Sequence, residues 1–160
     1  MNRITAWRIT APEYAETAFS GPGARKYGGR FNSPGTPLVY TADSLALAIL
    51  ELLVRVNVRR RVAESTCMPV SFPESLITVY EASDLPEDWD SRPYEESGQQ
   101  VGDTWIESEQ SLVLKVPSVV VPLEYSYLIN PEHPEVDRLV IGDPISLPVD
   151  PRLHGELASS

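Results

Sequence analysis

The ten residues 45–54, LALAILELLV, constrain the fold most, because nine of them are apolar and the tenth is Glu51. Asp43 or Ser44 can cap a helix that begins here, and we expect this helix to continue to about Asn57. A helix that is apolar on every side is stable only when the rest of the protein covers it. We therefore expect a buried helix that carries Glu51 into or beside the core.

The remaining pattern predicts few helices and strands spread along the whole chain. Apolar and β-branched runs indicate strands over residues 4–9, 30–32, 38–41, 66–72, 76–81, 111–116, 119–128 and 139–147. Thr10, Pro12 and Glu13 resemble a capping box, which predicts a helix to about Phe19. A second short helix over residues 98–108 is expected to be interrupted by Gly102.

These elements indicate the fold class. The regular alternation of strand and helix that builds a doubly wound parallel sheet is missing. No linker divides the chain. We expect an α+β fold: a single compact domain over residues 1–160, with a mixed or antiparallel sheet and few helices.

Charge and cysteine content disfavour several classes of function. The net charge of −10 argues against direct binding of nucleic acid or of anionic membranes, because both depend on lysine and arginine. Cys67 is the single cysteine and neither a signal-peptide core nor a membrane-spanning run is present, so we expect a cytoplasmic protein. His133 and His154 form no ligand-spaced cluster with Cys67, and we expect no metal site.

Glu51 has two interpretations. A carboxylate in a poorly hydrated region needs a cation or hydrogen-bond donors. Arg55 lies four residues further on, on the same helical face, so a structural ion pair is one interpretation. In the other, Glu51 lines a cleft, where a carboxylate in a low dielectric stabilises positive charge that develops on a substrate.

Three further residues are candidates for binding chemistry. Residues 27–32, YGGRFN, place Arg30 after two glycines, and a guanidinium suits phosphate; a surface arginine at the start of a strand is the alternative. The glycine spacing matches neither a dinucleotide fingerprint nor a P-loop. Tyr40 can stack on a heterocycle or pack within a sheet. Ser111 can present a hydroxyl at a strand edge or bond a turn.

Taken together, three segments resemble the RES-domain family, the toxin component of bacterial RES–Xre toxin–antitoxin modules. They are FSGPGARKYGGRFNSPGTPLVYTADSLALAILELL, GDTWIESEQSLVLKVPSVVVP and YLINPEHP, and the resemblance runs in order over about residues 7–141. The arginine, glutamate and serine that give the family its name correspond to Arg30, Glu51 and Ser111, and a tyrosine of the same site to Tyr40. Phe31 stands where the family often has tryptophan.

The resemblance implies a fold similar to that of ADP-ribosyltransferases and an activity that consumes NAD⁺. It implies a toxin that acts as an NAD⁺ glycohydrolase or phosphorylase, with ADP-ribosylation of a protein in some members. It also implies a partner, an Xre-type helix-turn-helix antitoxin that binds the toxin and blocks its site. No cofactor is expected, because NAD⁺ is the substrate; water, inorganic phosphate and a protein side chain remain open as the acceptor.

The family's roles are consistent with the chemistry of these side chains. Glu51 is expected to stabilise the oxocarbenium-like ribose as nicotinamide leaves, and Arg30 to hold the pyrophosphate. Tyr40 is expected to orient the nicotinamide ring, and Ser111 to hydrogen-bond the ribose or the carboxamide. The expected NAD⁺-binding residues are Arg30, Tyr40, Tyr27, Asn32 and Ser111.

Other classes of function stay open at this point. The same pocket would serve a protein ADP-ribosyltransferase. It would also serve a module that binds NAD⁺ or ADP-ribose without turnover. A third alternative is an interaction protein in which the pairing of Glu51 with Arg55 is structural.

Overall fold

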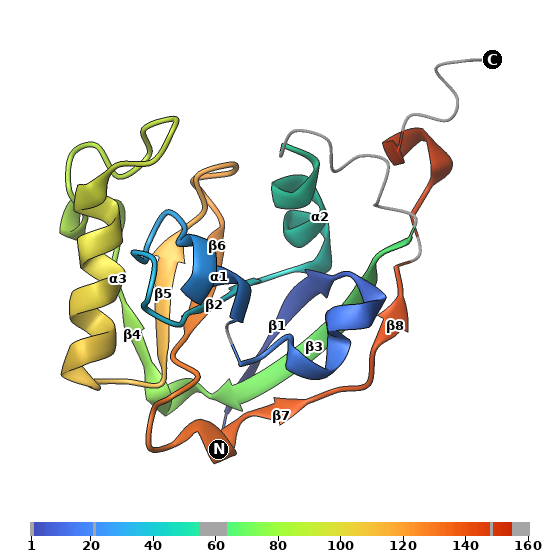
Figure 1. Cartoon of the computed structure of the whole chain (residues 1–160), viewed down its shortest axis with the longest axis horizontal. Coiled ribbons are helices and arrows are strands. Elements are labelled where there is room, and N and C mark those ends of the chain that lie inside the picture. The colour runs from blue at the N-terminus through green and yellow to red at the C-terminus, as the bar shows by residue number, and fades with distance from the viewer. Residues whose placement is uncertain (1, 21, 55–63, 148, 155–160) are drawn as a thin grey trace.

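In the described part of the chain, eight strands form one curled sheet, in the order β4-β5-β6-β2-β1-β3-β7, with β8 also paired to β3 (Figure 1). The computed structural model describes residues 2–20, 22–54, 64–147 and 149–154. Of these strands, β4 and β5 pair in parallel and the other recorded pairs are antiparallel. The strands are β1 (Arg3–Thr10), β2 (Val39–Ala42), β3 (Thr66–Pro73), β4 (Ile77–Val79), β5 (Val113–Pro117), β6 (Tyr125–Ile129), β7 (Val140–Ile141) and β8 (Ile145–Ser146).

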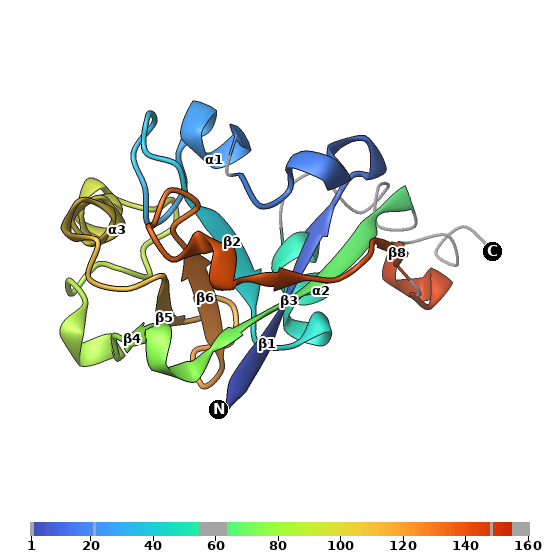
Figure 2. The same ribbon diagram turned by 90° about the horizontal axis from the view of Figure 1, so that it is seen from below.

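The helices lie over different parts of this sheet. The α-helices of the described residues are α1 (Pro22–Tyr27), α2 (Leu45–Leu53) and α3 (Glu96–Ser108). Short 3₁₀ turns lie at Pro12–Thr17, Glu74–Leu76, Ala82–Asp84, Val136–Arg138 and Pro151–His154. Figures 1 and 2 show α3 beside the β4–β5 end of the sheet and α2 beside β1. The two longer helices therefore cover different halves of the sheet.

Alternation along β5 and β6 divides the core into two layers. Val113 and Ile129 join Phe72 and Val70 in one buried cluster. Their neighbours Leu114 and Leu128 face the other way, into a cluster with Trp105 of α3. A third cluster packs Trp7 and Ile9 of β1 and Cys67 of β3 against the apolar side of α2. Each half of the sheet is thus anchored to its own helix.

The predicted fold class is confirmed, with corrections at particular elements. Thr10 does not cap a helix, because it belongs to β1 and pairs with Thr66 of β3; a 3₁₀ turn capped by Ala11 follows instead. The predicted strand over residues 119–128 begins only at Tyr125, because residues 118–124 form a turn. The strand predicted over residues 139–147 is two short strands, β7 and β8.

Helix α2 follows the prediction at its start and differs from it in its surroundings. Ser44 is the N-cap and accepts a hydrogen bond from the amide of Leu47. Within α2, Leu47 is buried, whereas Leu50 is 44% exposed. Val54, which follows the helix as its C-cap, is 64% exposed. The expectation of cover on every side is therefore wrong for the residues described. The continuation to Asn57 lies outside them.

Helix α3 is continuous through Gly102, which corrects the predicted interruption. Both of its inner glycines, Gly98 and Gly102, are buried. No helix among the described residues has the length and apolar character to cross a bilayer.

Candidate active site

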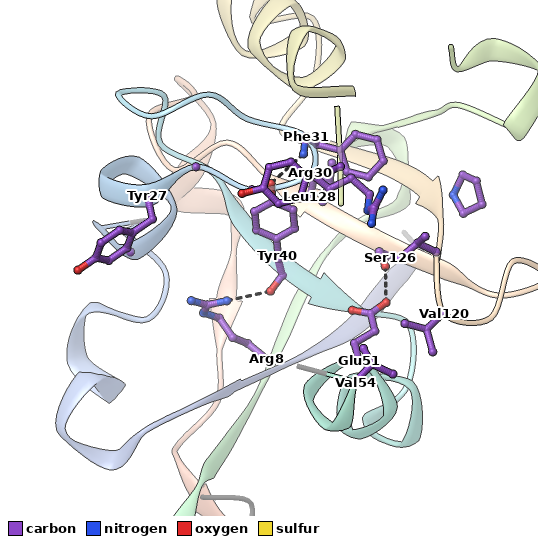
Figure 3. A pocket seen from close by; sticks show the side chains of 16 residues that line it. Arg8, Tyr27, Arg30, Phe31, Tyr40, Glu51, Val54, Val120, Ser126 and Leu128 are labelled. Carbon is purple, nitrogen blue, oxygen red and sulfur yellow. Dashed lines mark hydrogen bonds between the residues drawn. The ribbon is translucent and has the colours of Figure 1, made fainter. Parts of the chain in front are cut away.

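A pocket of about 570 Å³ opens where β1 and β2 separate. In the described chain these two strands pair only through Trp7 and Ala42, whereas β2 pairs with β6 along its whole length. The walls come from β1, from α1 and the loop after it, from β2, α2 and β6, and from the end of β5 and the segment that follows. They include Arg8, Arg30, Tyr40, Glu51, Val120, Ser126 and Leu128 (Figure 3). The volume lies in the range of small-molecule sites, about 300–1,000 Å³.

Arg30 lies on a tight turn, residues 29–32, which we call the Arg30 turn. The amide of Gly29 donates to the carbonyl of Asn32 at 2.9 Å, and the two residues form an isolated β-bridge. A side chain at position 29 would place its Cβ 2.6 Å from the hydroxyl of Tyr40. Glycine is therefore needed at this position because the backbone and Tyr40 approach each other closely.

The guanidinium of Arg30 is fixed by main-chain carbonyls. Nη1 donates to the carbonyl oxygens of Trp89 and Ser91, each at 2.8 Å, and Cζ lies 6.0 Å from the ring centroid of Tyr94. Burial lowers the pKa of Arg30, and the like charge of Arg92 lowers it further. Arginine starts from so high a pKa that the group stays a cation near neutral pH. The pocket thus contains a positive charge in a set orientation.

Tyr40 contributes its ring to the pocket and its hydroxyl to the Arg30 turn. The hydroxyl donates to Oδ1 of Asn32 and accepts from the amide of Phe31 at 3.1 Å. The ring lines the pocket beside Leu128. A flat apolar surface is therefore presented to a ligand, while the polar end of the side chain orders the turn.

Glu51 projects from α2 into the same pocket. Its Oε1 accepts a hydrogen bond from the hydroxyl of Ser118 at 2.9 Å and one from the hydroxyl of Ser126 at 3.0 Å. An ionised carboxylate can only accept hydrogen bonds, and these two hydroxyls donate to it. Arg55, the partner in the structural interpretation of Glu51, lies outside the described residues. The predicted ion pair therefore stays a prediction.

Arg8 and Ser126 are polar pocket residues that were not predicted from the sequence. Arg8 extends from β1, and its Nη1 donates to the carbonyl of Tyr40 at 3.0 Å, next to the place where β1 and β2 part (Figure 3). Ser126 lies on β6 between two tyrosines and contacts Glu51. An arginine flanked by Trp7 and Ile9 in a predicted strand is the signal that could have found Arg8.

Ser111 and Asn32 were predicted as site residues, and the structure places both outside the pocket. Ser111 precedes β5 and is not among the residues that line the pocket, whereas Pro117 at the other end of that strand is. Its hydroxyl accepts from Trp105 Nε1 and Thr78 Oγ1 and donates to the carbonyl of Val113. These three bonds use its whole hydrogen-bonding capacity.

Asn32, the last residue of the Arg30 turn, is completely buried and does not line the pocket. Its Oδ1 accepts from Tyr40, and its Nδ2 donates to the carbonyl of Thr36 at 2.8 Å. The structure therefore gives it contacts that shape the turn. Tyr27, also predicted to bind NAD⁺, lines the pocket from the end of α1 but is 70% exposed at its rim.

Metal chemistry was not expected from the sequence. Among the residues that the structure describes, no group of three or more histidine, cysteine or acidic side chains is arranged to hold a metal ion.

The fold resembles that of a solved toxin–antitoxin system. A chain from the crystal structure of the M. tuberculosis MbcT–MbcA toxin–antitoxin complex superposes with a TM-score of 0.70 at 19% identity, covering 99% of this chain and 91% of that one. The curled mixed sheet with few helices is an ADP-ribosyltransferase-like fold, as the resemblance implied.

Comparison of the sequence gives the family. The RES domain family model matches residues 5–150. Toxin Res of Yersinia enterocolitica is 36% identical over 148 residues, covering 92% of this chain and 97% of that protein. Toxin Res of Photorhabdus laumondii is 37% identical over 125 residues, 78% of this chain and 80% of that one. The Prs ADP-ribosylating toxin of a Sphingobium species is 37% identical over 134 residues, 81% and 83% of the two chains. This chain belongs to the RES domain family.

Proposed function

We propose that this chain is the toxin of a toxin–antitoxin module and consumes NAD⁺ by cleaving the bond between nicotinamide and ribose. One observation carries the proposal: the pocket that contains the Arg30 guanidinium also contains the Glu51 carboxylate, oriented by two serine hydroxyls. Membership of a family whose curated members are named as toxins supports it.

Glu51 is proposed to act on the ribose. As nicotinamide leaves, positive charge builds on the anomeric carbon and the ring oxygen. A carboxylate held beside that carbon in a poorly hydrated pocket stabilises the charge, as in glycosidases. Ser118 and Ser126 keep the carboxylate from turning, so little reorganisation is needed in the transition state.

Arg30 and Arg8 are proposed to bind the pyrophosphate. Within the described chain, the hydrogen bonds of Arg30 all leave from Nη1, and Nε and Nη2 carry the donors that a phosphate needs. Arg8 supplies a second positive charge on the facing wall. Two cations in one pocket of a chain with net charge −10 support an anionic ligand.

The nicotinamide ring is proposed to lie against Tyr40 and the apolar wall formed by Leu128 and Val120. No metal or cofactor is required, because the pyridinium of NAD⁺ is already a cationic leaving group. Nicotinamide takes the electron pair of the broken bond and leaves neutral, so the positive charge passes to the ribose beside Glu51.

Protein ADP-ribosylation is the second candidate function. The name of the Sphingobium relative, an ADP-ribosylating toxin, favours it. The same residues would carry the cleavage, and only the acceptor of ADP-ribose would differ: a protein side chain in place of water or inorganic phosphate.

An antitoxin partner is part of the proposal. The structural neighbour comes from a toxin–antitoxin complex, which supports a partner that covers this chain as well. We propose an antitoxin of the Xre helix-turn-helix type and a cytoplasmic site of action. DNA contacts would come from the antitoxin, because this chain is acidic.

The test is to incubate the purified chain with NAD⁺, with and without phosphate, and to identify the products by mass. ADP-ribose indicates hydrolysis, and an ADP-ribose phosphate that appears only with phosphate indicates phosphorolysis. A mass increase on an added protein indicates transfer. Nicotinamide release that stops at or below one equivalent of protein would contradict the proposed enzyme.

A further inference from the structure

We propose that helix α3, which contributes no residue to the pocket wall, positions Arg30 through two of its residues, Gly102 and Asp103. The inference that α3 fixes the position of the Arg30 turn depends only on the contacts between them. The inference that this position matters for NAD⁺ binding rests on the proposed function. Neither residue lines the pocket described above.

Gly102 lets the Arg30 turn lie directly on the helix backbone. A Cβ at position 102 would sit 1.6 Å from the carbonyl oxygen of Phe31, and one at Gly98 would sit 2.9 Å from the carbonyl oxygen of Arg30. The obstacle is main chain in both cases, so a side-chain rotation cannot relieve it. Two glycines in one helix are intrinsically unfavourable, and this contact is the compensating feature.

Asp103 fixes the far side of the turn. Its Oδ1 accepts a hydrogen bond from the amide of Ser33 at 2.9 Å. Gln99 lies four residues before Asp103 and therefore on the same face of α3. Its Nε2 donates to the carbonyl of Gly29 at 3.2 Å. The turn is thus tied to α3 on both sides of Arg30.

These contacts fix the place of the guanidinium. Tyr40 holds the turn from the sheet side through its bonds to Phe31 and Asn32, and α3 holds it from the other side. The carbonyls of Trp89 and Ser91, which accept from Arg30, belong to the segment that leads into α3. A shift of the turn away from α3 would move Arg30 relative to Glu51. A misplacement of about 1 Å can cost roughly 100-fold in rate or binding.

The experiment compares four variants of the full chain: Gly102→Ala, Asp103→Ala, Asp103→Asn and, as control, Thr104→Ala at an exposed position of the same helix. Affinity for NAD⁺ is measured in a Glu51→Gln background, which prevents turnover from depleting the ligand. Hydrogen exchange of residues 28–36 is measured without NAD⁺. The turnover of the same four variants is measured with Glu51 intact.

We expect Gly102→Ala to weaken NAD⁺ binding about tenfold or more and Asp103→Ala to weaken it severalfold. Exchange at residues 28–36 should accelerate in both, while β5 and β6 keep their protection. Asp103→Asn should restore affinity and protection, because its amide oxygen accepts the same bond. Thr104→Ala should match the parent. The loss should fall mainly on KM, because α2 and β6 hold Glu51 independently.

Unchanged exchange and affinity in Gly102→Ala and Asp103→Ala would overturn the inference, as would an asparagine variant as weak as the alanine variant. If Gly102→Ala does not fold, the Asp103 pair decides the outcome. If the parent chain does not bind NAD⁺, the proposed function fails and the exchange data alone decide whether α3 fixes the turn.

Discussion

The hydroxyl of Ser126 on β6 donates a hydrogen bond to Oε1 of Glu51 on α2 at 3.0 Å. Ser118, just after β5, donates to the same oxygen at 2.9 Å. The helix packs against β1, whereas both serines belong to the β5–β6 half of the sheet. These bonds therefore join the two halves at the pocket and set the direction of the carboxylate that the proposed chemistry needs.

Ser126→Ala should lower the rate of NAD⁺ cleavage about 10- to 100-fold with little change in affinity, because a hydrogen bond to a charged group is worth roughly 1.5–3 kcal/mol. Ser111→Ala is the matched comparison. It removes the acceptor of Trp105 Nε1 and should cost about 1–3 kcal/mol of stability, leaving the rate per folded molecule unchanged. Steady-state kinetics and urea unfolding of both variants check this. Equal loss of rate in the two variants would contradict the assignment.

Tyr40→Phe should retain the ring in the pocket while removing the hydroxyl that bridges Phe31 and Asn32. The buried Oδ1 of Asn32 then loses this donor, so we expect a loss of about 1–3 kcal/mol of stability and weaker NAD⁺ binding. Calorimetric binding and chemical denaturation measure the two effects. A phenylalanine variant with parental affinity would show that the hydroxyl does not order the Arg30 turn.

Arg30→Lys should weaken NAD⁺ binding about tenfold or more although the charge is kept. An ammonium group cannot bridge the carbonyls of Trp89 and Ser91 and also present a planar fork to a phosphate. Arg25→Lys is the control, because its pairing with Glu132 is exposed and contributes little. Titration of both variants with NAD⁺ is the measurement. An Arg30→Lys variant with parental affinity would contradict the proposal that the guanidinium of Arg30 donates two hydrogen bonds to the pyrophosphate.

The stability of the fold should decrease at alkaline pH through Tyr127. Burial, together with the nearby carboxylate of Asp43, raises the pKa of Tyr127 from 10.0 to about 12. The native state thus retains a proton that the unfolded chain releases, so this contribution is complete below about pH 10 and is lost as the pH rises through about 12. Unfolding free energies from pH 8 to 12 should show this decline. Tyr127→Phe should lack it, and identical slopes in both proteins would exclude Tyr127 as the cause.

Local patterns predicted the α+β class and several elements, because capping and strand signals depend on neighbouring residues. Examples are the strand from Thr66 and the cap of α2, where Ser44 is one of the two residues predicted as caps. Gly102 shows the limit of such signals. Glycine is required there because the backbone of Phe31 lies against the helix. Phe31 is about seventy residues earlier in the chain, so local sequence patterns cannot predict this contact.

The candidate site divides in the same way. Arg30, Tyr40 and Glu51 were predicted, and the structure brings them to one pocket, although their roles stay proposals. The sequence does not show which serine reaches the pocket, because Ser111 lies just before β5 and Ser126 lies on β6, and only the pairing of the strands places them. Ser126 reaches the pocket because β6 pairs with β2, which places Ser126 opposite Ala42.

Glu51→Gln tests the central claim most directly. Glutamine keeps an oxygen that accepts from Ser118 and Ser126 but carries no charge. Nicotinamide release from saturating NAD⁺ should fall about 100-fold or more, with folding and NAD⁺ affinity close to those of the parent. A folded Glu51→Gln protein that releases nicotinamide at the parental rate would contradict a catalytic role for this carboxylate.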